Sequence, residues 1–409
     1  MTPTLLSRLS SALTERRLRV HGLLLAGCLW SVYVFDVATP GLLDRHGLVK
    51  GTDFVHFYVL GLLALQHRGS ALYNTLLQSA IAQQVIPGAH PLYFVALYGP
   101  QVSLLFAPFA RLPYAWALFA WSCLNAAIFS ACCWAIWRTC PRLGDHRTTI
   151  IILAIAYPAF FHLIAWGQTS APALACFTLA YLALRSNRPF LAGLAIGLLI
   201  YKPQLGLVTV LLLLFSRQWS ALAGALISAF TELSIGGLYY GTGVVRDYAK
   251  TLGHLQQVFP YLEPRPYTTH CLRTFWSMLV PSPVVATILY VASAAVVLFL
   301  TISIWRSHSP LSLRYSAMLL ATVLFAPHLT VYDLVVLAPA FLLLADWYRE
   351  RQLSSSPLPM LLYLCYSLPL IGPLSHYTHV QLSVIAFVGL TGYLWKIAAR
   401  PERPVVAMA

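Results

Sequence analysis

Carboxylates are scarce in this sequence, so each candidate for acid–base chemistry can be considered in turn. The 409 residues include only 12 Asp and Glu. Asp53 stands out because it directly precedes an apolar stretch, FVHFYVLGLLAL, at 54–65. A carboxylate in that position suits a helix N-cap. It equally suits a general base, because a carboxylate partly withdrawn from water beside aromatic rings has a raised pKa. Spacing alone does not choose between the two.

A cationic candidate lies where two apolar runs meet. The runs at 189–201 and 203–215 are short for a full crossing and join at Lys202-Pro203. An ammonium at membrane depth is costly unless it is paired, which makes Lys202 a functional candidate. The alternative is that Lys202 extends to the outer lipid headgroups.

Several other polar residues are placed at the ends of apolar runs. His328 could bind a phosphate or orient a base, or it could cap a helix end. Gln168 could bind sugar hydroxyls or satisfy a helix end. Glu232, inside an apolar run, is expected to form a hydrogen bond between helices. Arg265, His270 and Arg273 lie among aromatic residues, which suits a headgroup and sugar platform, or an ordinary loop at the membrane surface.

The elements that must position these residues are membrane helices. Hydrophobic residues make up 59% of the chain and charged residues 9%, with a mean hydropathy of +0.73. The apolar residues fall in repeated runs, and the lengths of the longer runs match the roughly 20 residues that cross a bilayer as a helix. A soluble protein and a single anchor with a soluble head are both excluded. The candidate runs are 20–39, 97–112, 114–137, 149–166, 170–184, 189–201, 203–215, 219–240, 284–304, 312–327, 331–345, 358–371 and 380–396.

The basic residues predict the orientation of the chain. Lys and Arg number 26 and lie mostly in short loops between apolar runs, as the positive-inside rule describes, so no nucleic-acid partner is needed. We predict a cytoplasmic N-terminus (1–19), one membrane domain (20–398) with outer loops at about 40–96 and 241–283, and a cytoplasmic tail (399–409). The expected location is the inner (plasma) membrane.

The number of crossings is open between residues 40 and 137. Both termini on one side require an even number, whereas thirteen runs are present. Either 54–65 also crosses, or 97–112 is a short re-entrant or interfacial piece. The predicted fold is therefore all-α and polytopic, with about 12–13 transmembrane or membrane-embedded helices.

Neither a metal nor a cofactor is predicted. The eight cysteines form no CxxC and no Cys/His pattern with metal-ligand spacing, and they are expected to be small packing residues. No HxxE or DxD pattern and no nucleotide-binding glycine pattern is found. We expect metal-independent chemistry.

Five motifs in order resemble a known family. They are Thr52-Asp53-Phe54 to Leu72-Tyr73-Asn74, Tyr98-Gly99-Pro100 to Leu112-Pro113-Tyr114, Gly167-Gln168-Thr169, Arg188-Pro189 to Tyr201-Lys202-Pro203-Gln204, and Pro327-His328 to Tyr332-Asp333-Leu334. This order, from about 50 to 345, resembles glycosyltransferase family 87, the membrane mannosyltransferase-like group of GT-C fold. The chain departs from the family pattern at Gly99, at Ser170 in place of Asn, and in the Tyr-Asp-Leu motif. These departures affect the expected identity of the donor and the acceptor more than they affect the expected fold.

The resemblance implies an enzyme that transfers a hexose, typically mannose, from a polyprenyl-phosphate carrier to an acceptor hydroxyl at the outer face, with inversion. The acceptor would be a glycolipid or a glycan, with membrane lipids as surroundings. Asp53 matches the family's catalytic carboxylate. We expect Lys202, His328, Arg265 and Arg273 to bind the donor phosphate. The residues expected to contact the sugar or the acceptor are Gln168, Tyr58, His56, Asp333 and His270.

Two rival functions make different predictions. A transporter or flippase of a lipid-linked saccharide would use Lys202 and Glu232 as binding groups at the membrane midplane and would form no glycosidic bond. A non-catalytic assembly partner would tolerate the loss of Asp53.

Overall fold

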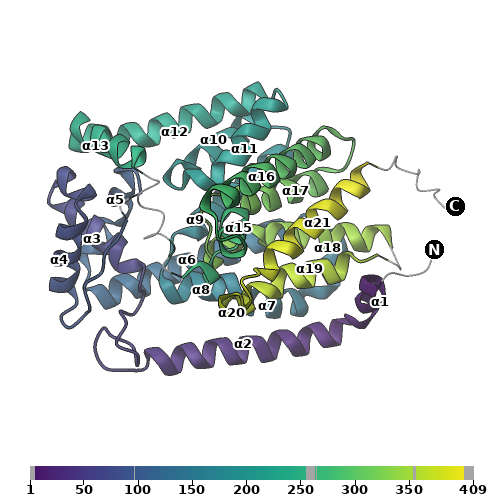
Figure 1. Ribbon diagram of the computed structural model, residues 1–409, viewed down its shortest axis with the longest axis horizontal. Coiled ribbons are helices and arrows are strands. Elements are labelled where there is room, and N and C mark those ends of the chain that lie inside the picture. Colours follow the sequence, from purple (N-terminus) through teal and green to yellow (C-terminus); the bar gives the residue numbers. More distant parts are fainter. Residues whose placement is uncertain (1–4, 96, 255–262, 264, 353–355, 400–409) are drawn as a thin grey trace.

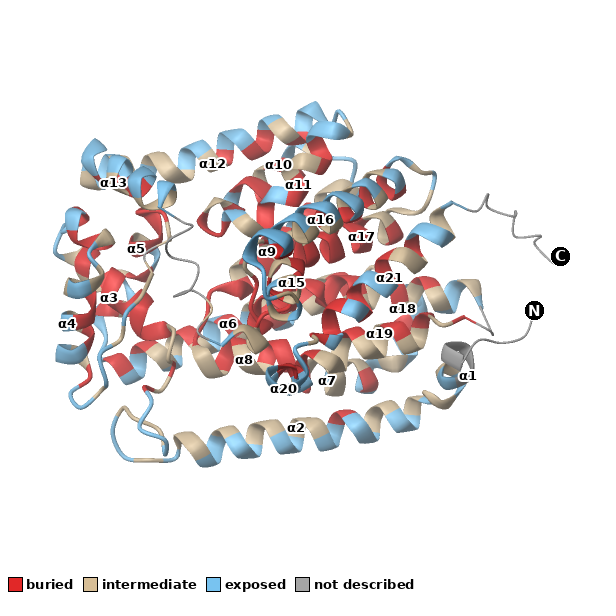
Figure 2. Ribbon diagram, viewed as in Figure 1, coloured by how far each residue is buried: buried red, intermediate tan, exposed pale blue. Residues whose placement is uncertain are grey.

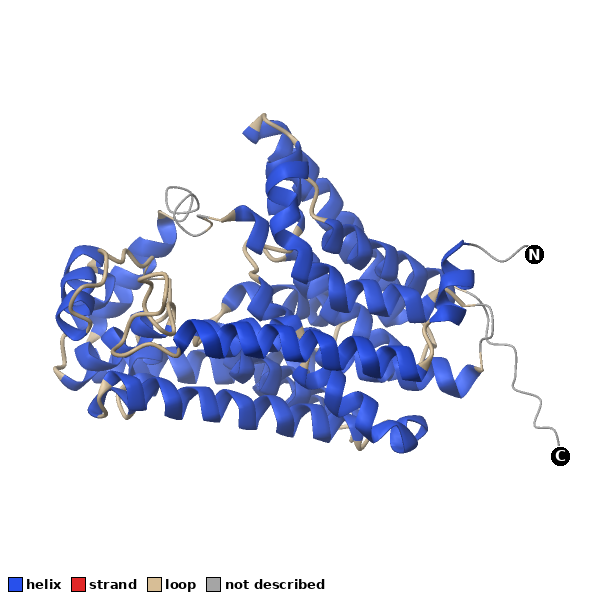
Figure 3. Ribbon diagram, turned by 90° about the horizontal axis from the view of Figure 1, so that it is seen from below, coloured by secondary structure: helices blue, strands red, loops and turns tan. Residues whose placement is uncertain are grey.

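The protein is a bundle of helices elongated along one axis. The computed structural model describes residues 5–95, 97–254, 263, 265–352 and 356–399. Within these residues there is no β-strand, only the isolated bridges Leu43–Val49 and Thr269–Thr330 (Figure 3). In Figure 1 helix α1 and the end of α21 lie at one end of the long axis, and α3, α4 and α13 lie at the other. The predicted all-α class is confirmed.

Six helical segments are long and apolar enough to cross a membrane, and a bent pair makes a seventh. The six are α2 (Glu15–Val37), α6 (Tyr114–Trp137), α12 (Trp219–Tyr240), α16 (Pro283–Arg306), η6 with α18 (Val331–Leu337, Ala338–Arg351), and α19 with η7 and α20 (Leu358–Ser367, Leu368–Leu374, Ser375–Thr378). The bent pair is η3 with α7 (Pro141–His146, Arg147–Ile155) and α8 (Pro158–Trp166), at 45°. Pro158 explains the bend, because the residue before a proline is pushed out of the helical region.

Shorter helices complete the bundle. The apolar ones are α3 (Phe54–Leu65), α9 (Ser170–Arg185), α10 with η4 (Pro189–Gly197, Leu198–Tyr201), α11 (Pro203–Phe215), α17 (Leu311–Phe325) and α21 (Leu382–Ala398). The others are α1 (Leu5–Ala12), η1 (Gly69–Tyr73), α4 (Thr75–Val85), α5 (Gln101–Phe106), η2 (Phe109–Arg111), α13 (Thr242–Gly253), η5 (Pro266–Thr268) and α15 (Leu272–Leu279). A multi-pass membrane protein is thus confirmed.

The open question between residues 40 and 137 receives a structural answer. The run 97–112 does not form one helix, because it contains only the six-residue α5 and the three-residue η2. Helix α3 has 12 residues and is therefore about 18 Å long, shorter than the hydrocarbon layer. Pro100, Pro108 and Pro113 divide the 97–112 run into these short pieces. Its listing among the membrane-crossing candidates was therefore wrong, and the short-piece alternative fits.

Apolar side chains cover the outside of the long helices. Phe230 and Leu238 on α12 are 75% and 86% exposed, and Phe299 on α16 is 66% exposed. Figure 2 shows the same exposed surface along α2 and α16, around a buried interior. Inside, α10 and α12 approach so closely that a Cβ on Gly193 would lie 1.9 Å from the Ala221 carbonyl oxygen. Small residues at such a crossing are typical of membrane helix pairs.

Candidate active site

Asp53 begins helix α3 but does not cap it. Its side chain accepts no hydrogen bond from the backbone of the first turn. Instead, Gln168 Nε2 donates to Asp53 Oδ2 at 2.7 Å, and the Asp53 backbone N–H donates to the Trp166 carbonyl oxygen at 3.0 Å. The N-cap alternative is therefore wrong for the side chain. Its carboxylate points to the end of α8.

The turn that carries Gln168 is fixed by its neighbours. Helix α8 ends at Gly167, whose φ of +69° favours glycine, and a Cβ there would lie 2.6 Å from Phe54 Cβ. On α6, Trp121 Nε1 donates to the Gly167 carbonyl oxygen at 3.0 Å, and Asn125 Nδ2 donates to that of Gln168 at 3.0 Å. These contacts hold the Gln168 amide toward Asp53.

Lys202 lies in a buried ion pair. Its Nζ is 2.8 Å from Asp333 Oδ1, and both side chains are 3% exposed. Ser170 joins them, with its hydroxyl donating to Asp333 at 2.5 Å and accepting from Lys202 at 3.0 Å. The alternative that Lys202 extends to the headgroups is therefore wrong. The pairing also leaves Lys202 with less positive charge for a phosphate than the sequence suggested.

The sequence explains both halves of this pair. The chain breaks between η4 and α11 because Pro203 cannot continue the preceding helix, which places Lys202 at the break. Asp333 forms a capping box with Thr330 at the start of η6. Tyr332 lies beside them, with Lys202 Nζ 5.1 Å from the centre of its ring.

A second charged cluster joins the loop before α15 to the chain after α17. Glu263 Oε1 is 2.5 Å from Arg273 Nη2 and 2.9 Å from His328 Nδ1, and Thr274 Oγ1 donates to Glu263 Oε2 at 3.0 Å. The Glu263 side chain is 7% exposed. Burial raises the pKa of Glu263, but the hydrogen bond and charge of His328 and the charge of Arg273 outweigh it, so the net pKa is lowered. This carboxylate stays ionised.

Backbone contacts bring the two clusters together. Thr269 and Thr330 form an antiparallel bridge, and the His270 N–H donates to the Leu329 carbonyl oxygen at 2.9 Å. Arg273 Nε also donates to the Pro327 carbonyl oxygen. The segment 327–333 thus carries His328 into one cluster and Asp333 into the other.

The surroundings of Asp53 favour a proton acceptor. Burial raises the pKa of the Asp53 carboxyl to about 6, while the Gln168 hydrogen bond and the charges of Lys202 and His328 act in the opposite direction. A carboxyl with this pKa is largely ionised at neutral pH and accepts a proton more readily than an ordinary aspartate.

The remaining predicted residues have other contacts. Tyr58 donates its hydroxyl to the Leu112 carbonyl oxygen at 2.8 Å, and His270 Nδ1 is 2.8 Å from Ser383 Oγ. His56 is buried against Phe94, with ring centroids 4.8 Å apart, and lines a cavity of about 10 Å³. None of these three rings has a hydrogen bond to Asp53 or Lys202. Arg265 is exposed.

Sequence reasoning missed two members of the site. Ser170 follows the Gly-Gln-Thr motif directly, so the motif itself was the available signal. Glu263 falls in the predicted outer loop 241–283, and its partner His328 is 65 residues away. Glu232 was expected to bond between helices, and it accepts a hydrogen bond from Gln101 Nε2 of α5 at 3.1 Å.

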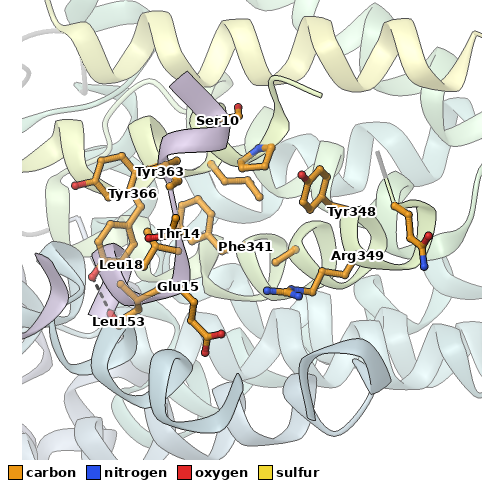
Figure 4. Close-up of a pocket in the computed structure, with 15 residues that line it drawn as sticks. Ser10, Thr14, Glu15, Leu18, Leu153, Phe341, Tyr348, Arg349, Tyr363 and Tyr366 are labelled. Carbon is orange, nitrogen blue, oxygen red and sulfur yellow. Dashed lines mark hydrogen bonds between the residues drawn. The ribbon is translucent and has the colours of Figure 1, made fainter. Parts of the chain in front are cut away.

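A large cavity lies away from all these residues. A space of about 700 Å³ opens where α2 begins, between α18 and α19 (Figure 4). Figure 4 shows Glu15, Phe341, Arg349 and Tyr366 on its walls. No residue predicted for the site lines it. Among the described residues, no group of three His, Cys, Asp or Glu side chains could hold a metal ion. Metal-independent chemistry remains a prediction.

Comparison with known proteins supports the family. The model of glycosyltransferase family 87 matches residues 96–331, more than half of the chain. This range includes Gln168, Lys202 and His328, whereas Asp53 and Asp333 lie outside it, so it is narrower than the predicted 50–345. A search of the curated proteins and a search of the solved structures each found no match. The family match and the membrane helices together indicate a membrane glycosyltransferase that acts on a sugar donor and an acceptor, and the chain belongs to glycosyltransferase family 87.

Proposed function

We propose that this protein transfers a hexose, with mannose as the first candidate, from a polyprenyl-phosphate carrier to an acceptor hydroxyl on the outer side of the plasma membrane, through a GT-C type fold. The acceptor is a glycolipid or a glycan. The observation that carries the proposal is the Asp53 carboxylate, which begins a helix without capping it and is held by Gln168. A carboxylate that does not cap its helix, and whose direction is fixed by a side-chain amide, is suited to act as a general base.

The reaction that fits this arrangement is a single displacement. Asp53 accepts the proton of the acceptor hydroxyl, and the acceptor oxygen forms a bond to the anomeric carbon of the sugar. The bond from that carbon to the phosphate oxygen breaks, and the polyprenyl phosphate leaves with the bonding electrons. Attack opposite to the leaving group inverts the anomeric centre.

The leaving group needs cations more than it needs an acid. A sugar in transfer passes through an oxocarbenium-like state, and the phosphate carries the departing negative charge. Arg273 and His328, which already bind a carboxylate, are suited to hold that phosphate. Lys202 acts through its ion pair with Asp333, which helps to fix the end of the segment 327–333.

The test is transfer of radiolabelled mannose from synthetic polyprenyl-phosphate-mannose into a membrane lipid extract. Wild type and Asp53→Asn are compared after purification, matched for melting temperature and elution volume. We expect transfer by wild type and a rate about 10²–10⁴-fold lower for Asp53→Asn. Equal rates would remove Asp53 from the mechanism.

The specificity for the donor sugar is tested in a separate experiment. Polyprenyl-phosphate-glucose, supplied to the same wild-type preparation, tests whether mannose is preferred. If the protein moved labelled lipid across the membrane of proteoliposomes and formed no new glycosidic bond, the result would favour the transporter alternative.

A further inference from the structure

The Glu263 carboxylate is held as an anionic ligand would be held. Three donors converge on its two oxygens: Arg273 Nη2, His328 Nδ1 and Thr274 Oγ1, at 2.5, 2.9 and 3.0 Å. The side chain is 7% exposed. A guanidinium, an imidazole and a hydroxyl around one anion are also the groups that bind a phosphate in proteins.

Contacts other than those of Glu263 join the two chain segments that carry Arg273 and His328. Arg273 Nε donates to the Pro327 carbonyl oxygen, next to His328. The Thr269–Thr330 bridge and the hydrogen bond from the His270 N–H to the Leu329 carbonyl oxygen join the same two segments by their backbones. If the carboxylate moved away, these contacts would still hold the two segments together.

The cluster is linked to the proposed reaction centre by a shared chain segment. The charge of His328 acts on Asp53, and the segment that carries His328 continues through the capping box into Asp333. An anion in the place of the Glu263 carboxylate would therefore contact the segment that also carries Asp333.

We propose that Glu263 occupies the phosphate site of this enzyme in the absence of lipid, and that the polyprenyl phosphate displaces its carboxylate. This inference rests on the proposed function for the identity of the lipid. Glu263 pairs with the half-buried Arg273 and His328 between turnovers. Its return competes with the product, whose phosphate monoester carries more negative charge than the donor's phosphodiester, and thereby promotes product release.

The experiment measures binding of a short-chain polyprenyl phosphate that carries no sugar, to the purified full-length protein in detergent. Glu263→Gln removes the competing charge and should bind the lipid about tenfold more tightly than wild type. Arg273→Gln should bind it at least tenfold more weakly. Glu15→Gln is the matched control, because Glu15 also accepts from an arginine, a histidine and a threonine, and it should not alter the affinity.

Equal or weaker binding by Glu263→Gln, in a protein that melts as wild type does, would overturn the proposal. If Glu263→Gln does not fold, Glu263→Asp replaces it, because a carboxylate one methylene shorter competes less well and should also tighten binding. Unchanged binding by Glu263→Asp would then count against the proposal.

Two further arms separate the ligands and the hypotheses. Inorganic phosphate as a competitor should displace the lipid only at far higher concentration, and equal potency would overturn the assignment to a lipid phosphate. Because the assay needs no sugar transfer, tighter binding by Glu263→Gln together with an inactive wild type would refute the proposed function while leaving the phosphate site in place.

Discussion

Two glutamates in different parts of the molecule have the same types of partner in different surroundings. Glu15, where α2 begins, accepts from Arg19 and Thr149 and lies 3.0 Å from His146 Nδ1, and its side chain is 32% exposed. Glu263 accepts from an arginine, a histidine and a threonine too, but it is 7% exposed. Water screens the first cluster, which ties α2 to α7. The second lies in a low dielectric, where charges act strongly on one another.

Cavity volume and buried charge point to different parts of the molecule as the active site. The space of about 700 Å³ is beside Glu15, whereas the cavity beside His56 holds only about 10 Å³. A search by volume alone would choose the Glu15 end as the active site. The buried charges instead indicate that the active site is at the Asp53 end. Charges inside a membrane protein are costly and are retained mainly for function.

The largest expected effect comes from breaking the Lys202–Asp333 pair. Lys202→Met leaves Asp333 as an unpaired buried carboxylate, and we expect the free energy of unfolding to fall by about 3–5 kcal/mol. Arg19→Met removes one partner of the more exposed Glu15 and should cost less than about 1 kcal/mol. Thermal and denaturant unfolding in detergent compare the two variants.

A double variant serves as the control for this pair. Lys202→Met with Asp333→Leu removes both charges and should recover much of the lost stability. Equal destabilisation by Lys202→Met and Arg19→Met would show that burial does not distinguish the two ends.

The second prediction concerns pH. Asp53 accepts a proton only when it is ionised, so kcat/KM should fall as the pH drops through about 6, by about tenfold for each further unit. The pKa is raised above the ordinary value of 3.8, so the loss begins about two units higher than for a solvated aspartate. Transfer rates between pH 4.5 and 8 test this. A midpoint near 4 would contradict the burial of the base.

The third prediction moves that midpoint. Gln168 Nε2 stabilises the ionised form of Asp53, so its removal in Gln168→Met should raise the midpoint by about one unit. Gln101→Met is the matched control, because Gln101 also donates to a carboxylate, that of Glu232, yet makes no hydrogen bond to Asp53. A shift in both variants, or a downward shift in Gln168→Met, would refute the role of this hydrogen bond.

Local features of the site could be predicted from the sequence, and long-range pairs could not. Helix α3 begins and ends at the residues of the apolar stretch 54–65, and the chain breaks at Lys202 because Pro203 follows. The contact from Lys202 to Asp333 spans 131 positions, and two separate breaks in helices must meet to form it. Hydropathy along the chain carries no information on that meeting.

The direction of the Asp53 side chain could not be predicted from the sequence either. The sequence placed Asp53 correctly at the start of a helix but could not say whether its carboxylate turns back to the first turn. That direction depends on Gln168, which is held 115 positions away by the Gly167 turn and by α6. The run 97–112 was read as one segment because most of its residues are apolar, although Pro100 and Pro108 break it into short pieces.

The smallest expected effect is at the large cavity beside Glu15. Ala345→Phe adds a ring to the wall of α18 that faces this space, where about 700 Å³ can receive it. Arg349→Gln removes a charge from the same wall. Because both residues lie at the other end of the bundle from Asp53, we expect transfer rates within about twofold of wild type and unchanged melting temperatures. A tenfold loss of transfer in a folded variant would mean that a substrate occupies this cavity, and volume would then have ranked the two ends correctly.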